Sequence, residues 1–263
     1  METYLLYPVI GSFVGLMAGL LGAGGGLIIV PALLFTFRAD GFSNVVIMHL
    51  AIGTSLATIF FTSMSSTYAH HRHGAVQWST FCGLTPGILA GALAGAAVAD
   101  QMSSQALRTI FGVFELVVGA QMWFGWRTIA HGVTPGMARL SIAGSTIGFA
   151  SAVVGIGGAT LTVPYLVWSS MNLRQAVATS AALGLPIALG GAAGFLISGW
   201  KQPLLPELST GYIYWPALAG ITVTSLLFAP LGARLAHRLP TMALRRVFAL
   251  FVVVLGLRIL VTI

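Results

Sequence analysis

The sequence predicts an all-α polytopic membrane protein of two homologous helical repeats, with about eight full transmembrane spans plus two short helices that follow glycine breaks. Three observations support this prediction. Hydrophobic residues make up 57% of the 263 residues and charged residues only 6%, whereas an ordinary soluble domain is about 25% charged. Apolar runs of spanning length follow one another with short loops between them, and two glycine-rich stretches recur at matching places in the two halves.

The apolar runs define the expected spans. A hydrocarbon core of roughly 30 Å needs about 20 apolar residues per helix. The runs cover residues 4–37, 45–69, 78–99, 106–126, 138–170, 175–199, 212–233 and 243–263. The first and fifth runs are too long for one straight span and contain glycines at 22–26 and 155–158. Each is therefore predicted to form a long helix, a break, and a short second helix that begins near Leu27 or Thr160.

The two halves of the chain share three blocks in the same order. The matching blocks are 15–35 with 148–168, 51–55 with 176–180, and 106–108 with 243–245. Such a series predicts a tandem duplication within one membrane domain, with a first transmembrane repeat at 1–127 and a second at 138–263.

The net charge of +7 comes from basic residues scattered singly between apolar runs. This pattern indicates cytoplasmic loops rather than a nucleic-acid partner. If each broken segment crosses the membrane twice, the repeats are inverted and one side collects eight basic residues against four; if each crosses once, the split is seven against five. The positive-inside rule favours the inverted arrangement. Both arrangements put residues 234–246 in the cytoplasm and both termini outside.

The glycine breaks predict the substrate site. Unwound backbone inside lipid is tolerated only against protein or a water-filled cavity, and paired breaks in two repeats are typical of a transporter's binding site. Helix N-termini at such breaks suit an anion, and nearby Thr and Ser hydroxyls can bind an oxyanion. Two alternatives stay open, close helix packing for the glycines and bonds to helix carbonyls for the hydroxyls. The predicted substrate-binding residues are Gly24, Gly25, Gly26, Thr54, Ser55, Gly157, Gly158, Ala159, Thr179 and Ser180.

Glu115 is the one acidic residue deep inside a predicted span, which makes it the candidate for coupling transport to an ion. Pairing with Arg108 or Arg127 near the span ends is the alternative. The histidines at 70–73 have no carboxylate or thiolate beside them, so no metal site is expected. No pair of acids or Ser-His arrangement supports an enzyme. We expect no cofactor, and the oligomeric state is left open.

Several of these motifs together resemble the TauE/SafE family of sulfite-exporter-type membrane permeases over essentially the whole chain. The motifs are 22–26 with Pro31, 51–55, 73–78, 106–112, 155–158 with Pro164, and 176–180. The resemblance implies a multi-pass carrier of a bacterial-type inner membrane that exports sulfite or organosulfonates. The expected mechanism is alternating access around the two breaks, with one half rocking against the other. A carrier of a different small anion or solute on the same scaffold is the alternative. Ala159 and Ala178 replace the glycines at 26 and 53, which predicts two unequal half-sites.

Overall fold

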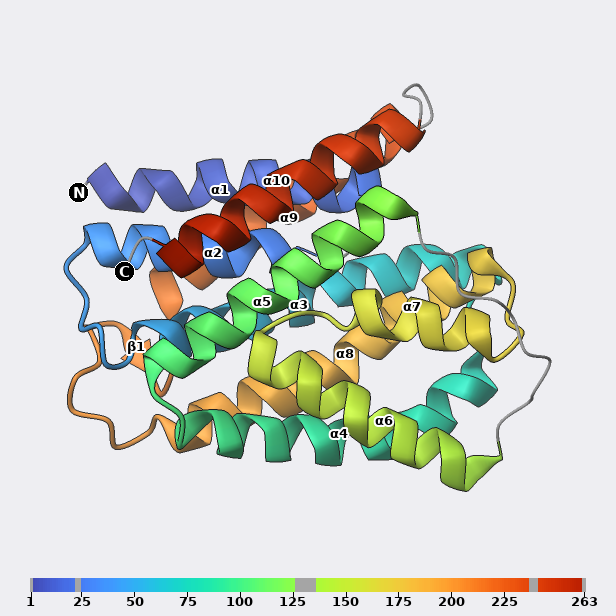
Figure 1. Cartoon of the computed structure of the whole chain (residues 1–263), viewed down its shortest axis with the longest axis horizontal. Coiled ribbons are helices and arrows are strands. Elements are labelled where there is room, and N and C mark those ends of the chain that lie inside the picture. Colours follow the sequence, from blue (N-terminus) through green and yellow to red (C-terminus); the bar gives the residue numbers. More distant parts are fainter. Residues whose placement is uncertain (1, 22–24, 126–135, 237–240, 262–263) are drawn as a thin grey trace.

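A computed structural model describes residues 2–21, 25–125, 136–236 and 241–261. Within these ranges the chain forms ten helices and one two-stranded antiparallel hairpin (Figure 1). The elements are α1 (Glu2–Leu21), α2 (Gly26–Ala39), α3 (Ile47–Arg72), α4 (Trp78–Asp100), α5 (Ser104–Phe124), α6 (Met137–Val154), α7 (Ala159–Trp168), α8 (Leu173–Ser198), β1 (Ser209–Thr210), β2 (Ile213–Tyr214), α9 (Trp215–Ala236) and α10 (Thr241–Val261).

Six of these helices are long and apolar enough to cross a membrane: α3, α4, α5, α6, α8 and α9. The all-helical, multi-span prediction is thereby confirmed, while α1 and α10 are not among the six and the predicted number of eight stays an expectation. The two short helices begin at Gly26 and Ala159, one residue before the predicted starts at Leu27 and Thr160.

Local sequence explains where several helices begin and end. The side chains of Ser103 and Asn172 accept hydrogen bonds from the backbone N–H groups of Ala106 and Gln175, and so cap α5 and α8. Gly125 and Gly155 adopt left-handed backbone at the ends of α5 and α6, a conformation that glycine reaches without a steric penalty.

The first helix of each half packs against the fourth helix of the other half. Figure 1 shows α1 beside α9 along one long side of the molecule and α6 beside α4 along the opposite side. Glycines make both contacts close: a Cβ added to Gly15 would lie 2.4 Å from the carbonyl oxygen of Ser225, and one added to Gly148 would lie 2.3 Å from that of Ile88. Gly15 and Gly148 are 133 residues apart, the offset that aligns the two halves.

Two further pairs join homologous helices to each other. In the α3–α8 pair, Gly191 faces Leu56 and Ala181 accepts a hydrogen bond from Thr67, so the chain directions are opposite. In the α5–α10 pair, Gly112 faces Leu260 and Gly119 faces Val253, again with opposite directions. Each pair thus consists of corresponding helices that run antiparallel.

One pair of corresponding contacts is unequal. α8 packs along α4, where Cβ atoms added to Gly190 and Gly194 would lie 3.0 and 2.5 Å from the Cβ atoms of Ala92 and Ala96. The counterparts of these glycines on α3, Ser65 and Ala69, are exposed. α3 contacts α9 much less than α8 contacts α4. The fold is therefore closed between α4 and α8 and splayed at the corresponding place between α3 and α9.

Candidate functional site

The two broken segments meet in the interior of the fold. A Cβ added to Gly26 at the start of α2 would lie 2.8 Å from the Cα of Ile156 and 3.0 Å from the carbonyl oxygen of Gly155. Figure 1 shows the α6–α7 connection, which contains both partners, near the middle of the molecule. Only a glycine at position 26 permits this approach, because any side chain would collide with backbone.

The second break is formed by two left-handed glycines. Gly155 has φ 78° and its N–H donates to the carbonyl of Ser151 at 2.9 Å, which ends α6. Gly158 has φ 76° and precedes α7, and its carbonyl accepts from Leu161 at 2.8 Å and Thr162 at 2.7 Å. The N–H groups of the first helical residues have no partner within the helix and carry its positive dipole end. They are directed back into the break.

The first break is described in part. Gly25 precedes α2, and its carbonyl accepts from Ile28 at 3.0 Å and Ile29 at 2.9 Å. Gly25 and Gly26 are buried, while the predicted site residue Gly24 lies outside the described residues. Neither α2 nor α7 has a side-chain cap at its N-terminus. Within the described residues, the first N–H groups of α7 are therefore available to another acceptor.

The two threonines of the predicted site tie one half to the other. Thr54 Oγ1 accepts from the backbone N–H of Tyr214 at 3.0 Å, and Thr179 Oγ1 accepts from that of Gln77 at 3.0 Å. Tyr214 and Gln77 are the residues immediately before α9 and α4. Both threonines are completely buried, so these bonds satisfy amides that would otherwise be unpaired at the starts of two spans.

Substituting Thr54 by valine should lower stability, because the buried N–H of Tyr214 would lose its acceptor at nearly unchanged volume. An unsatisfied buried donor costs about 1–3 kcal/mol. We expect Thr54→Val to lower the apparent Tm in detergent, and Thr54→Ser to restore it. The counterpart Thr179→Val should have a smaller effect, because Gln77 is only partly buried. A Thr54→Val protein as stable as the parent would contradict this assignment.

Ser55 contacts the second break directly, and Ser180 contacts it through Thr162. Ser55 Oγ donates to the carbonyl oxygen of Gly155 at 2.9 Å. Ser180 Oγ is hydrogen-bonded to Thr162 Oγ1, and Thr162 in turn donates to the carbonyl of Gly158 at 2.9 Å. Both serines therefore hold the break in its left-handed shape, from α3 on one side and α8 on the other.

Sequence reasoning missed Ser151, which lies one turn before the break in α6. Its side chain is fully buried, and its Oγ has no hydrogen-bond partner among the described residues. That oxygen would lie 3.5 Å from a Cβ added to Gly158. A buried hydroxyl normally has a hydrogen-bond partner, and water or a ligand could supply one here. The repeat comparison could not signal it, because the corresponding residue is Ala18.

Glu115 lies on α5, and the Cβ of its side chain faces Gly256 on α10. Its side chain is fully buried, and neither carboxylate oxygen has a hydrogen-bond partner in the described part of the chain. Arg108, one of its two predicted alternatives, instead donates to Gln105. The other, Arg127, lies outside the described residues.

Two buried aromatic side chains near the ends of α3 and α4 have structural contacts. His49 is buried, with Nε2 at 3.0 Å from the carbonyl oxygen of Ala99, and its ring stacks on Tyr212. Burial raises the pKa of Tyr212, which keeps its hydroxyl protonated to donate to Asp100 at 2.9 Å. Among the described residues no group of three or more His, Cys, Asp or Glu is arranged to hold a metal ion. Cys82, on α4, is exposed.

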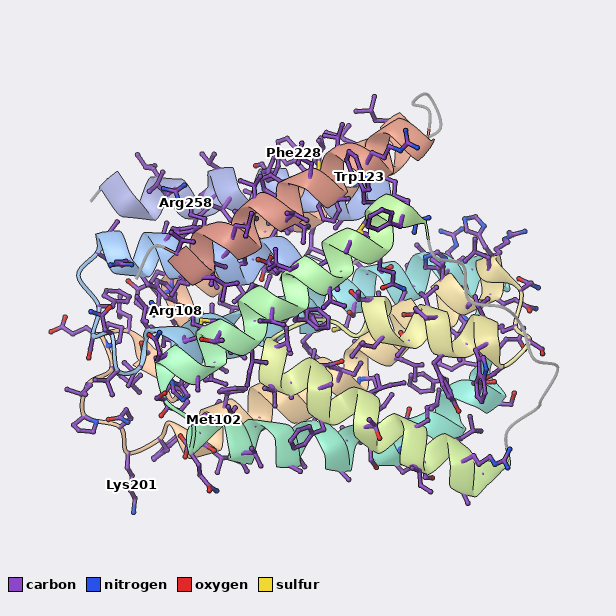
Figure 2. All side chains as sticks on the ribbon, viewed as in Figure 1. Met102, Arg108, Trp123, Lys201, Phe228 and Arg258 are labelled. Atoms are coloured by element: carbon purple, nitrogen blue, oxygen red, sulfur yellow. The ribbon has the colours of Figure 1, made fainter. Side chains whose placement is uncertain are left out.

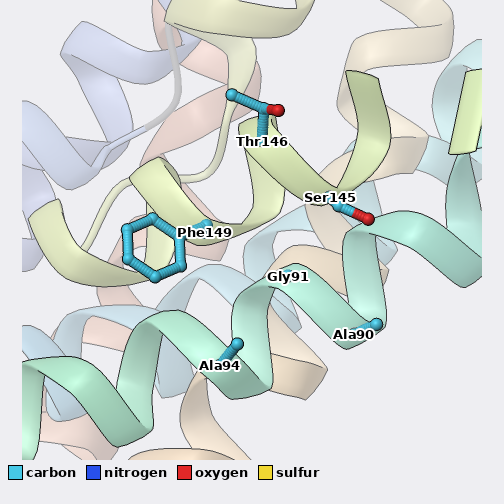
Figure 3. A pocket seen from close by; sticks show the side chains of 6 residues that line it. All are labelled: Ala90, Gly91, Ala94, Ser145, Thr146 and Phe149. Atoms are coloured by element: carbon cyan, nitrogen blue, oxygen red, sulfur yellow. The ribbon is translucent and has the colours of Figure 1, made fainter. Parts of the chain in front are cut away.

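A surface pocket lies elsewhere, between α4 and α6. Its volume is about 470 Å³, and Figure 3 shows the residues that line it: Ala90, Gly91, Ala94, Ser145, Thr146 and Phe149. Ser145 Oγ donates to the carbonyl of Ser141 in its own helix at 3.0 Å. With small residues and a self-bonded serine, this groove has the character of a helix-packing seam and has none of the unpaired groups found at the breaks.

The fold and the buried, paired breaks define a multi-pass helical membrane transporter, and comparison with known proteins identifies its family. Residues 7–259 match the model of the family described as "Sulfite exporter TauE/SafE". The chain belongs to this family.

Curated relatives carry consistent names. A "Probable membrane transporter protein" of Haemophilus influenzae is 35% identical over 255 residues, which cover 96% of each chain. A protein of the same description from Methanocaldococcus jannaschii is 25% identical, covering 97% of this chain and 96% of its own. A third, YunE of Bacillus subtilis, is 23% identical, and the match covers 97% of this chain and 96% of YunE. These relatives are named as transporters, not enzymes, and this protein is a transporter of the same family.

Proposed function

We propose that the protein is a secondary transporter that exports a small sulfur-containing anion, such as sulfite or an organosulfonate, bound between the two helix breaks. The observation that supports this most is the contact of Gly26, the first residue of α2, with Gly155 and Ile156 in the second break. In this proposal the N-termini of α2 and α7 supply N–H groups and positive dipole ends to one anion. The family description, sulfite exporter, favours a sulfur oxyanion as the occupant.

An uncharged site suits a carrier, which must release its substrate. In this proposal the anion accepts hydrogen bonds from N–H groups at the starts of α2 and α7 and from Ser151 Oγ, which lies beside Gly158 and has no partner among the described residues. Ser55 and Ser180 shape the site by holding the second break. Without a lysine or arginine at the break, binding depends on neutral donors and a dipole and is correspondingly reversible.

The two repeats are inverted in the membrane in this proposal. The antiparallel pairing of α3 with α8 and of α5 with α10 supports it, because corresponding helices that pair antiparallel are related by an axis lying across them. Both termini then lie on the extracytoplasmic side of the membrane. The end of the molecule with His70, His73 and Arg174, which interact electrostatically, faces the cytoplasm and would attract anions.

Alternating access follows from the unequal contacts of α8 with α4 and of α3 with α9. Inverted repeats can exchange conformations, so the tight contact at Gly190 and the open one at Ser65 would swap between two states. The splayed contact lies toward the end of α3 that carries His70, which makes the present state open toward the cytoplasm. Because α1 packs on α9 and α6 on α4, the moving units are mixed bundles rather than the two sequence halves.

Flux in proteoliposomes tests the proposal. Sulfite, thiosulfate, sulfate, sulfoacetate and acetate would be compared as labelled substrates, with transport of sulfur anions and not of acetate as the expected result. Ser151→Ala should reduce flux of the preferred anion about tenfold to a hundredfold, the effect of losing one hydrogen bond to a charged group of about 1.5–3 kcal/mol.

The matched control is Ser145→Ala in the same helix, whose hydroxyl is bonded within α6 and lines the groove in Figure 3. It should leave flux unchanged. Equal flux in both variants would remove Ser151 from the site. If protein shown to be folded transports none of the sulfur anions, the proposed substrate class is overturned and a different small solute is favoured.

A further inference from the structure

Glu115 is buried at the middle of the α5–α10 contact. A Cβ added to Gly256 on α10 would lie 3.0 Å from the Cβ of Glu115, so the two helices approach each other closely at this point. The flanking contacts, Gly112 with Leu260 and Gly119 with Val253, extend one turn to either side. The carboxyl group thus lies near the centre of a crossing between two long helices, far from either end.

The packing of this pair does not require a carboxyl group. The corresponding position in the second repeat is Val252, which is also completely buried in the same contact. An apolar side chain therefore fills the equivalent place, and a carboxylate there is unfavourable unless it is neutralised. The acid breaks the symmetry of the repeats at a site where the fold alone would accept valine.

No described cation neutralises Glu115. The helices packed most closely against α5 are α3, α6 and α10. Besides Glu115, the charged or titratable residues on α5 and on these three helices are Arg108, His49, Tyr68, His70, His71, Arg72, Arg139, Arg245, Arg246 and Arg258. None of them forms an ion pair or hydrogen bond with the carboxylate within the described ranges.

The arginines nearest to Glu115 along α5 and α10 have other partners. Arg108 donates to Gln105, Arg245 donates to the carbonyl of Gln121, and Arg258 lies 4.8 Å above the ring of Phe35. Figure 2 shows Arg108 and Arg258 toward the end of the molecule where the two termini lie. With these arginines bonded elsewhere, a proton can neutralise the buried carboxylate.

We propose that Glu115 is a proton-binding site that couples anion transport to a proton gradient, a role that rests on the transport function proposed above. The carboxylate takes up one proton from water on one side of the membrane. It stays protonated while the protein changes conformation, and it then releases that proton to water on the other side. α5 links this step to the break, because it contacts both α3, which carries Ser55, and α6, which carries Ser151.

The test separates coupling from transport itself. Proteoliposomes would be loaded with sulfoacetate, whose sulfonate and carboxylate groups both stay ionised between pH 6 and 8, so that a pH effect cannot come from the substrate. Two rates would be measured, isotope exchange without a pH gradient and net flux driven by a gradient in either direction. A pH-sensitive dye in the lumen would report proton movement directly.

Glu115→Gln should keep exchange within about threefold of the parent while the several-fold stimulation by the gradient and the dye signal fall to the no-gradient level. The matched control is Glu207→Gln, an exposed carboxylate in the loop before the hairpin, which should retain both. If the parent exchanges sulfoacetate without any response to the gradient, or if Glu115→Gln keeps the full response, the coupling role is overturned and the transport function stands. Absence of exchange in the parent for every sulfur anion would instead reject the function on which the role depends.

A second measurement covers the case in which Glu115→Gln does not fold. Dicyclohexylcarbodiimide reacts with protonated carboxyl groups in apolar surroundings. In the parent protein it should label Glu115 more at pH 6 than at pH 8, with a loss of gradient-driven flux that follows the extent of labelling. Labelling confined to other residues would count against the proposal.

Discussion

Gly158→Val is expected to reduce anion flux by at least a hundredfold. Gly158 has φ 76°, which a β-branched residue adopts only at a cost of about 1–3 kcal/mol. A Cβ there would also lie 2.2 Å from Ile187 Cδ1, so the α8 side chain must move. The valine would fill the space next to Ser151 Oγ in front of the α7 N-terminus. Flux in proteoliposomes and apparent Tm in detergent measure the two consequences.

Two companion variants separate loss of the site from loss of the fold. Asparagine tolerates left-handed backbone better than valine does. The Gly158→Asn protein should therefore have a Tm close to that of the parent, while its side chain still occupies the proposed anion position. Gly25→Ala, at the corresponding place in the first repeat, has ordinary helical backbone, and its Cβ would lie 2.7 Å from Val14 Cγ1 and 3.0 Å from Ile29 Cδ1, both at the ends of side chains that can move. It should lose less flux than either variant at 158. Parental flux in a folded Gly158→Asn protein would exclude the second break from the transport path.

The sequence was sufficient to predict the helices and their interruptions because both depend on local composition. The runs at 45–69 and 175–199 became α3 and α8, each of 26 residues, and the glycines at 155–158 end one helix and begin another. The gapless alignment of 15–35 with 148–168 also predicted that the two broken segments would be equivalent. Their contact at Gly26 and Ile156 could not be derived, since hydropathy says nothing about which helices become neighbours.

The roles of the predicted hydroxyls depended on partners far along the chain. Thr54 bonds to Tyr214, 160 residues away, and Thr179 bonds to Gln77, 102 residues away. The two readings considered from the sequence, a substrate ligand or a bond within the helix, omitted such a tie between halves. The packing of α1 against α9 and of α6 against α4 could have been predicted from a repeated pattern in the sequence. Gly83 and Gly95 of α4 recur as Gly220 and Gly232 of α9. Each of these glycines faces the first helix of the other half.

Disulfide cross-linking between α3 and α9 should trap the conformation opposite to the present one. In the state described here Ala92 and Gly190 are in contact, and their counterparts in the other repeats are Ala229 and Ser65. Exchange of the two interfaces would bring Ser65 and Ala229 to a Cβ separation near 3.8 Å, which a disulfide requires. Cys82 is the single native cysteine and is exposed, so Cys82→Ser provides a suitable background.

Both double variants, Ser65→Cys with Ala229→Cys and Ala92→Cys with Gly190→Cys, should form disulfides in membranes, because a working transporter visits both states. Each cross-link should remove more than nine-tenths of the flux, and reduction should restore it, whereas the four single-cysteine proteins should stay active throughout. A protein that moves its anion without exchanging these interfaces would cross-link only at 92 and 190. Oxidation of its Ser65→Cys with Ala229→Cys variant would leave the flux unchanged. Either result would contradict an exchange of the two interfaces and favour a motion confined to the breaks.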